Sequence, residues 1–206
     1  MPRKLSKTKN TLPPPTTTPP TPLPPYLTDG LPLPRLIVLD LDYTLWPFYS
    51  DIHITPPLRP TATPTAVTDR NSEPFTLYPD VPAILVLLPS LPSPIRLAVA
   101  SKSPVGDLCR EVLKLIRLPA GGKGERGVID VFDAGLEIYE GTKLRHFEVL
   151  RRRTGVAYED MLFFDDERPN REVERLGVTM QLVADGLSWA ELEKGVEEWR
   201  ARRGVI

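Results

Sequence analysis

Short apolar runs alternate with amphipathic stretches from Arg35 to the end of the chain, and polar or turn-forming residues separate them. Apolar runs of this length are typical of strands that are buried on both faces of a sheet. Because strands and helices alternate, the pattern predicts an α/β domain with a mostly parallel sheet. The predicted strands are 35–40, 95–100, 161–164 and 178–183, with another inside 128–139.

Helices are predicted between these strands. Leu108, Val112 and Leu115 recur at helical spacing, and Ser103 followed by Pro104 suits the start of that helix. The other predicted helices are 80–88 with Asp80 as N-cap, 142–153 with Gly155 as C-cap, 170–176, and 188–203 with Ser188 as N-cap.

Proline breaks the pattern in two places. Residues 1–33 are rich in proline and threonine and offer few side chains to a core, so a disordered or polyproline-like tail is predicted before a folded domain at 34–206. This tail is a candidate ligand for a proline-recognising domain or a targeting segment, and a solvated tail is the simpler alternative. Residues 46–79 are predicted to form an insertion, or flap.

Within this flap, 49–54 and 75–78 are expected to be the two arms of a hairpin, with a flexible excursion over 59–74. A second irregular stretch, at 119–127, is expected to be a loop because it is rich in glycine.

Composition narrows the functional classes. The formal net charge of -1 does not favour a nucleic-acid or membrane-surface partner. One cysteine, Cys109, cannot form an internal disulfide, which favours a reducing compartment. No apolar run is long enough to span a membrane, and no apolar segment follows the basic start. We therefore expect a cytoplasmic protein, with the nucleus as an alternative.

The first predicted strand ends in two acids, Asp40 and Asp42. Carboxylates two residues apart project to the same side of an extended chain. Their mutual repulsion in a partly dry site requires a compensating cation or proton, and Mg²⁺ is a suitable cation because it takes oxygen ligands. The alternatives are a solvated acidic turn and a calcium loop, although Leu45 stands where an EF-hand needs glycine.

Polar residues also follow two further strands. Asp165 and Asp166 close the strand over 161–164, and Ser101 closes the strand over 95–100. Because ligands of parallel sheets bind beyond the carboxyl ends of the strands, Asp40, Ser101 and Asp166 are expected near one another. Ser101 and the helix start behind it could bind phosphate, although a plain turn is the commoner role. Lys102 beside it and Lys143 are candidate phosphate ligands.

The order of these motifs, namely DxDxT, serine, lysine and an acidic pair, resembles the haloacid dehalogenase (HAD-like) superfamily. The longer strings DLDYTLWP, AVASKS, EIYEGTKLRHFE and FFDDERPN closely resemble the magnesium-dependent phosphatase-1 family over about residues 35–190. The resemblance implies a Rossmann-like three-layer sandwich with a short flap and no large cap domain.

The resemblance also implies roles for individual residues. Asp40 is the expected nucleophile, which becomes an aspartyl-phosphate, and Asp42 is the expected general acid and base. Magnesium is expected on Asp40, on the backbone carbonyl of Asp42 and on Asp166, with Asp165 in support, while Asn170 stands where many relatives have a further acid. Ser101 and Lys143 are expected to bind the transferring phosphoryl group.

Family members act on phosphotyrosine and on phosphorylated sugars or sugar-modified amines, so these are the expected substrates. Trp46, Tyr49 and His53 are candidate substrate contacts, with packing as the alternative for each. A carboxy-terminal-domain-type protein serine phosphatase is a second possibility, which the LWPF sequence after Thr44 disfavours. A third is a non-catalytic interaction protein on the same fold. Such a protein is expected to have lost at least one of the catalytic residues, and all of them are present.

Overall fold

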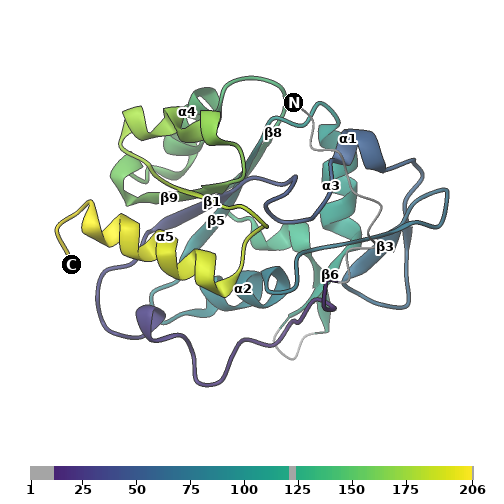
Figure 1. The fold of residues 1–206 in the computed structure, drawn as a ribbon, viewed down its shortest axis with the longest axis horizontal. Helices are drawn as coiled ribbons and strands as arrows, with labels where there is room; N and C mark the ends of the chain where they lie inside the picture. Colours follow the sequence, from purple (N-terminus) through teal and green to yellow (C-terminus); the bar gives the residue numbers. More distant parts are fainter. Residues whose placement is uncertain (1–11, 121–123, 206) are drawn as a thin grey trace.

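The computed structural model describes residues 12–120 and 124–205, and its centre is a five-stranded parallel sheet (Figure 1). The strands are β1 (Leu36–Leu39), β5 (Arg96–Ser101), β8 (Gly135–Ile138), β9 (Met161–Asp165) and β10 (Thr179–Leu182). Their order in the sheet is β10-β9-β1-β5-β8. After β1 the chain adds β5 and β8 on one side of it, and then adds β9 and β10 on the other side. The direction in which strands are added therefore reverses at β1. Ligands of such sheets bind at this reversal point, beyond the carboxyl ends of the strands.

Helices cover both faces of the sheet and give the expected three layers. One face carries α2 (Val81–Leu87), α3 (Gly106–Leu115) and α5 (Trp189–Ala201), and the other carries α4 (Lys143–Thr154) and the 3-10 segment η5 (Arg168–Leu176). The strand residues divide between the two cores by alternation: Ile37 and Leu39 lie in the first, Leu36 and Val38 in the second. Both faces of β1 are therefore buried, as its unbroken apolar run predicts.

Most of the predicted helix ends are confirmed. The Thr142 side chain accepts a hydrogen bond from the Arg145 N–H, and Gly155 adopts φ 69° at the end of the same helix. Ser188 caps α5 by accepting from the Glu191 N–H. Asp80 is the N-cap residue of α2 as predicted, but its carboxylate accepts from the Trp189 N–H and does not cap the helix. The predicted start at Ser103 differs, because the Ser103 oxygen accepts from the Val105 N–H in a turn and α3 begins at Gly106.

The predicted hairpin in the flap is wrong. Residues 50–53 form a short helix, α1 (Ser50–His53), and 59–76 form a three-stranded antiparallel sheet instead of a flexible excursion. The Asp69 carboxylate holds the flap turn by accepting from the backbone N–H groups of Thr55, Asn71 and Glu73, while Val67 and Phe75 are buried. The strands of this sheet are β2 (Arg59–Pro60), β3 (Ala66–Thr68) and β4 (Pro74–Thr76).

The predicted loop at 119–127 is also partly wrong, because its ends pair as an antiparallel hairpin of β6 (Arg117–Pro119) and β7 (Glu125–Gly127). The middle of that loop, 121–123, lies outside the described residues. The remaining elements are short 3-10 turns: η1 (Pro25–Leu27), η2 (Leu88–Ser90), η3 (Val128–Val131) and η4 (Tyr158–Asp160).

The prediction of a disordered tail is wrong for residues 24–33, which we call the N-terminal strap. Tyr26 and Leu27 are buried in the first core, and the Tyr26 hydroxyl donates to the Trp189 carbonyl. The guanidinium of Arg200, on α5, is 3% exposed and binds both carboxylate oxygens of Asp29 at 2.7 and 3.0 Å. It also donates to the carbonyls of Tyr26 and Pro32. Composition missed this anchor because one buried arginine organises a segment that has little apolar surface of its own.

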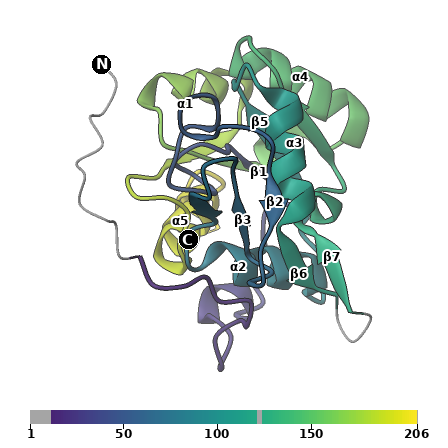
Figure 2. The ribbon, with the colours of Figure 1, turned by 90° about the vertical axis from the view of Figure 1, so that its right-hand side faces the viewer.

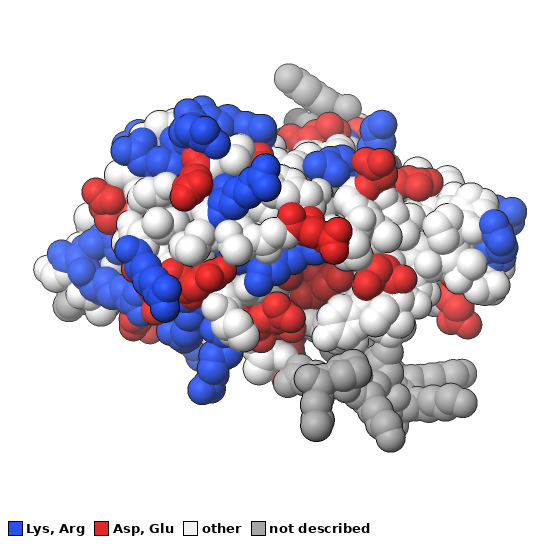
Figure 3. Space-filling model, turned by 90° about the horizontal axis from the view of Figure 1, so that it is seen from above, with Lys and Arg blue, Asp and Glu red and all other residues white. Residues whose placement is uncertain are grey.

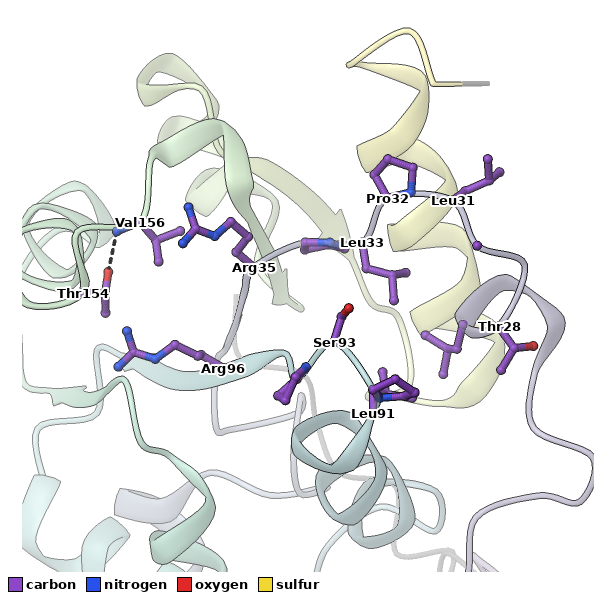
Figure 4. Close-up of a pocket in the computed structure, with 15 residues that line it drawn as sticks. Thr28, Leu31, Pro32, Leu33, Arg35, Leu91, Ser93, Arg96, Thr154 and Val156 are labelled. Carbon is purple, nitrogen blue, oxygen red and sulfur yellow. Dashed lines mark hydrogen bonds between the residues drawn. The ribbon is translucent and has the colours of Figure 1, made fainter.

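The strap lies far from α1. Figures 1 and 2 place the purple strap at the lower edge of the molecule and α1 at the upper edge. Beside the strap is a cavity of about 860 Å³, which Figure 4 shows between Leu31, Pro32 and Leu33 on one side and Leu91 and Ser93 on the other. Arg35 and Arg96 line it, at the amino ends of β1 and β5. This cavity is therefore at the opposite end of the sheet from the predicted site.

Residues 1–11 of the predicted tail lie outside the described part of the chain, and a proline-recognising partner for the tail stays a prediction. Over the described residues, none of the helices has the length and apolar character needed to cross a membrane.

Candidate active site

Lys143 joins the carboxyl ends of three strands. Its Nζ atom lies 2.6 Å from Asp40 Oδ1 and 2.9 Å from Asp165 Oδ2, and it donates to the Ala100 carbonyl on β5. Asp40 follows β1, and Asp165 ends β9. The lysine is 1% exposed. Burial lowers its pKa, but the two carboxylates outweigh burial and raise it, so the side chain stays charged. The predicted neighbours Asp40, Ser101 and Asp166 line one cavity, and Lys143 lines it with them.

The turn after β1 brings Asp42 to the same cavity as Asp40 by a different route from the one predicted. The chain does not stay extended, because Tyr43 adopts φ 54° and the N–H groups of Thr44 and Leu45 both bond to the Leu41 carbonyl. A non-glycine residue in this left-handed region is uncommon and frequently marks a functional turn. Both carboxylates line one cavity.

Three carboxylates form a candidate metal centre. Asp40, Asp165 and Asp166 each place an oxygen within 4.8 Å of the others. Burial raises the pKa of Asp166 to about 7, with the nearby charges of Asp165 and Glu167 adding to the effect. Burial likewise raises the pKa of Asp40 well above its usual range, although Lys143 opposes this. The cluster thus holds more negative charge than one lysine neutralises, and its all-oxygen donor set fits Mg²⁺.

Asn170 supports the cluster as an amide and not as a further acid. Its Nδ2 donates to both oxygens of Asp165 at 2.8 and 2.9 Å, and its Oδ1 accepts from Lys102 Nζ at 2.6 Å. An acid in this position would face Asp165 across a hydrogen-bond distance and repel it. The amide instead fixes the orientation of Asp165 and ties Lys102 to the cavity.

The Asp42 carboxylate is separate from the metal cluster. Its Oδ1 accepts from Trp46 Nε1 at 2.7 Å, and its Oδ2 accepts from the backbone N–H and the hydroxyl of Ser50, both at 3.1 Å. Burial raises the pKa of Asp42, and these hydrogen bonds oppose the rise. A carboxyl with a raised pKa in an open cavity is suited to general acid–base chemistry. Magnesium binding by its backbone carbonyl stays a prediction.

The carboxylates open into a cavity of about 160 Å³, whose lining carries charges of both signs. Figure 3 shows acidic side chains gathered near the middle of this face with basic ones beside them. Ser101 and Lys102 line the cavity as predicted, and so does Tyr49. The full lining is Asp40, Asp42, Tyr49, Asp51, Ser101, Lys102, Ser103, Pro104, Lys143, Asp166, Glu167 and Asn170.

Two predicted substrate contacts are not part of this lining. Trp46 is fully buried, stacks on Phe48 at 5.2 Å and donates to Asp42. The Nδ1 of His53 accepts from the Tyr49 N–H at 2.8 Å, which holds the turn of α1. Sequence reasoning also missed Ser50 and Ser103, whose hydroxyls lie 2.9 Å apart beside Asp42. No spacing or composition signal marks them, because the contact joins residues from the flap and from the loop after β5.

His146 anchors the helix that carries Lys143. Its Nε2 lies 3.1 Å from the Tyr139 carbonyl, and because a carbonyl only accepts, Nε2 carries the hydrogen. Nδ1 is buried and has no hydrogen-bond partner among the described residues. Burial, with the charge of Lys143 adding to it, lowers the pKa of His146 to about 4.

Acidification is therefore expected to destabilise the fold through His146. The unfolded state takes up this proton near pH 6.5, whereas the folded state resists it until about pH 4. The stabilisation is fully present above pH 6.5 and is lost as pH falls from 6.5 to 4. Thermal unfolding of the wild type and of His146→Gln across this range should show a steeper loss in the wild type. Parallel curves for the two proteins would contradict the prediction.

Known proteins share this chain's sequence over nearly its whole described length. The chain matches the Acid Phosphatase family over residues 32–202. It is 39% identical over 176 residues to magnesium-dependent phosphatase 1 of Homo sapiens, and the match covers 84% of this chain and 92% of the relative. It is 36% identical over 147 residues to a HAD-like hydrolase superfamily protein of Schizosaccharomyces pombe, covering 71% and 83%. The family match includes every residue that lines the 160 Å³ cavity.

Proposed function

The chain belongs to the acid phosphatase family, and we propose that it is a magnesium-dependent phosphatase that hydrolyses phosphate monoesters through an aspartyl-phosphate on Asp40. The observation that carries the proposal is the contact of Asp40 with Lys143, inside a carboxylate cluster and beside Asp42 in one open cavity. Phosphoryl transfer needs little covalent help from a protein and depends mainly on positioning and charge neutralisation. This arrangement supplies both.

In the first step, a carboxylate oxygen of Asp40 attacks the phosphorus, and the bond from phosphorus to the leaving oxygen breaks. Asp42 gives its proton to that oxygen, so the alcohol or phenol leaves neutral. In the second step, Asp42 takes a proton from water, the water oxygen attacks the phosphorus, and the bond to Asp40 breaks. Lys143 and Ser101 are proposed to bind the phosphoryl oxygens, with Lys102 at the edge of the cavity.

The metal site is proposed to consist of Asp40, the backbone carbonyl of Asp42 and Asp166, with Asp165 held by Asn170 in support. A bound Mg²⁺ would neutralise phosphoryl charge and reduce the repulsion between the phosphate and the carboxylates. The chain's own part is to hold the carboxylates together at the end of the sheet. Lys143 joins Asp40 and Asp165 by its two ion pairs, and Asp166 follows Asp165 directly in the chain.

Removal of magnesium tests this function. Exhaustive chelation is expected to lower the rate with p-nitrophenyl phosphate by at least about 100-fold, and added Mg²⁺ should restore it. Mg²⁺ should also raise the midpoint of thermal unfolding, since a ligand that binds only the folded state stabilises it. Full activity after chelation would refute the metal requirement. Strong preference for phosphoserine peptides would favour the serine-phosphatase alternative, and inactivity toward all phosphate esters would favour a non-catalytic protein.

The choice among phosphotyrosine and sugar phosphates is proposed to depend on Tyr49. It is the aromatic side chain of the flap that lines the cavity, and an aromatic face suits a phenyl or sugar ring. Tyr49→Ala is therefore expected to lower kcat/KM by about 10-fold or more, and unequally for an aryl phosphate and a sugar phosphate. Ile52→Ala, an exposed side chain of the flap outside the lining, is the matched control. Equal losses for both substrates would show that Tyr49 only packs.

A further inference from the structure

Three donors from the start of the flap surround the carboxylate of Asp42. We propose that Ser50 and Trp46 are positioning residues that fix this carboxylate and leave Oδ1 as the oxygen that carries the transferred proton. The inference rests on the proposed function, because it concerns the proton that Asp42 exchanges with the leaving group and with water. Neither residue is a catalytic residue, since each acts through Asp42.

The number of donors decides which oxygen stays available. An ionised carboxylate offers about four lone-pair positions. Oδ2 of Asp42 uses both of its positions, for the N–H and the hydroxyl of Ser50. Oδ1 uses one, for the indole N–H of Trp46, because an indole can only donate. Among the described residues no further donor reaches this carboxylate, so one position remains, on Oδ1. A proton can sit there without breaking any of the three hydrogen bonds.

The network behind Ser50 fixes the direction of its hydroxyl. A hydroxyl has one hydrogen, and in Ser50 that hydrogen is used for Asp42, so the Ser50 oxygen must accept from its other neighbours. Those neighbours are the Ser103 hydroxyl at 2.9 Å and the Cys109 thiol at 3.3 Å. Cys109 is fully buried, and burial raises its pKa to about 11, so it remains a thiol that can donate. All hydrogen bonds in this network therefore point toward Asp42.

The same network connects the flap to the phosphate-binding loop. Ser50 begins α1 and is fully buried, whereas Ser103 lines the cavity two residues after Ser101. The flap thus holds Asp42, the proposed proton donor, at a fixed position relative to the site proposed for the phosphoryl oxygens. Loss of this alignment should slow proton transfer while leaving substrate binding almost intact.

The leaving group supplies the test. An alcohol leaving group must be protonated by the general acid as it departs, because an alkoxide is a very unstable anion. p-Nitrophenolate is stable as an anion and needs this protonation far less. Ser50→Ala and Trp46→Phe are therefore expected to lower kcat for glycerol phosphate by about 10- to 100-fold, a part of the usual effect of a general acid. The loss with p-nitrophenyl phosphate should be at most a few-fold, and KM for both substrates should change little.

A matched control is Ser90→Ala, since the Ser90 hydroxyl donates to the Val86 and Leu87 carbonyls of its own helical turn and lies outside the cavity. Its kinetics should equal those of the wild type. The two test variants remove donors from different oxygens of Asp42, so Trp46→Phe, which keeps an aromatic ring beside Phe48, decides the question if Ser50→Ala does not fold.

The results distinguish failure of the positioning role of Ser50 and Trp46 from failure of the proposed phosphatase function. A wild type that hydrolyses both esters, with variants that lose the same factor on both, would overturn the positioning role and leave the proposed function intact. A wild type that hydrolyses neither ester would overturn the proposed function and this inference together. A selective loss on glycerol phosphate supports the assignment, because a merely structural role would not distinguish the leaving groups.

Discussion

Replacement of Asp40 by asparagine is expected to lower kcat by about 10⁴-fold or more and to abolish the phosphorylated enzyme. The neutral amide cannot form the acyl phosphate, so the reaction loses the intermediate that divides it into two easier steps. The Asp40–Lys143 contact of 2.6 Å would lose its charge, and the lysine would keep Asp165 as its partner at 2.9 Å. Because the lysine remains paired, the variant should still fold.

Rapid quenching of the reaction with a phosphorus-labelled substrate measures the intermediate directly, and steady-state hydrolysis measures kcat. A suitable control is Asp107→Asn, which changes a carboxylate that is exposed and lies outside the cavity. It should leave both the labelled enzyme and kcat unchanged. An Asp40→Asn enzyme that retains a substantial rate, with unfolding like the wild type, would refute the assignment of the nucleophile.

The position of the proposed catalytic residues follows from the sequence because parallel strands end at a common edge. Asp40, Ser101 and Asp166 each stand directly after, or at the end of, a buried strand, so the fold class alone brings them together. The hydrogen bonds around Asp42 do not follow in this way. They depend on the left-handed turn at Tyr43 and on α1, both of which arise from tertiary packing of the flap.

Trp46 shows which property of a side chain the sequence does not predict. The sequence indicates an aromatic residue near the nucleophile, but it does not show whether the ring faces substrate or core. In the structure the ring is buried against Phe48, and its polar edge is turned to Asp42. Periodicity identifies which strands and helices form. The roles of Trp46 and Ser50 depend instead on the irregular fold of the segment after Asp42, and the role of Ser103 depends on a contact with Ser50, which is distant in sequence.

The N-terminal strap is where composition was most misleading, and its removal is expected to have a large effect on stability. A chain that begins at Pro34 lacks Tyr26 and Leu27, and burial of each such side chain contributes about 1.5–3 kcal/mol. It also leaves the Arg200 guanidinium without its carbonyl and carboxylate partners, which costs about 1–3 kcal/mol for a buried polar group. We expect the free energy of unfolding to fall by about 4–9 kcal/mol, a large part of the usual total.

Thermal unfolding provides the measurement, and for a chain of this size such a loss corresponds to a decrease in Tm of roughly 10–35 °C. The matched control is a chain that begins at Pro24, which keeps the whole strap. It removes residues 1–23, and none of the described residues in 12–23 is buried. The control is expected to unfold like the full chain, because it loses none of the strap's contacts with Arg200.

Activity below the unfolding transition separates stability from catalysis. The strap lies beside the amino ends of β1 and β5, whereas the proposed catalytic carboxylates lie beyond the carboxyl ends of the strands. The chain that begins at Pro34 should therefore keep kcat within about 2-fold at low temperature, because distant and independent sites act additively. An unchanged Tm would show that the Arg200 contacts contribute nothing to the fold, and a lost kcat in a folded chain would show that the strap influences the catalytic cavity across the sheet.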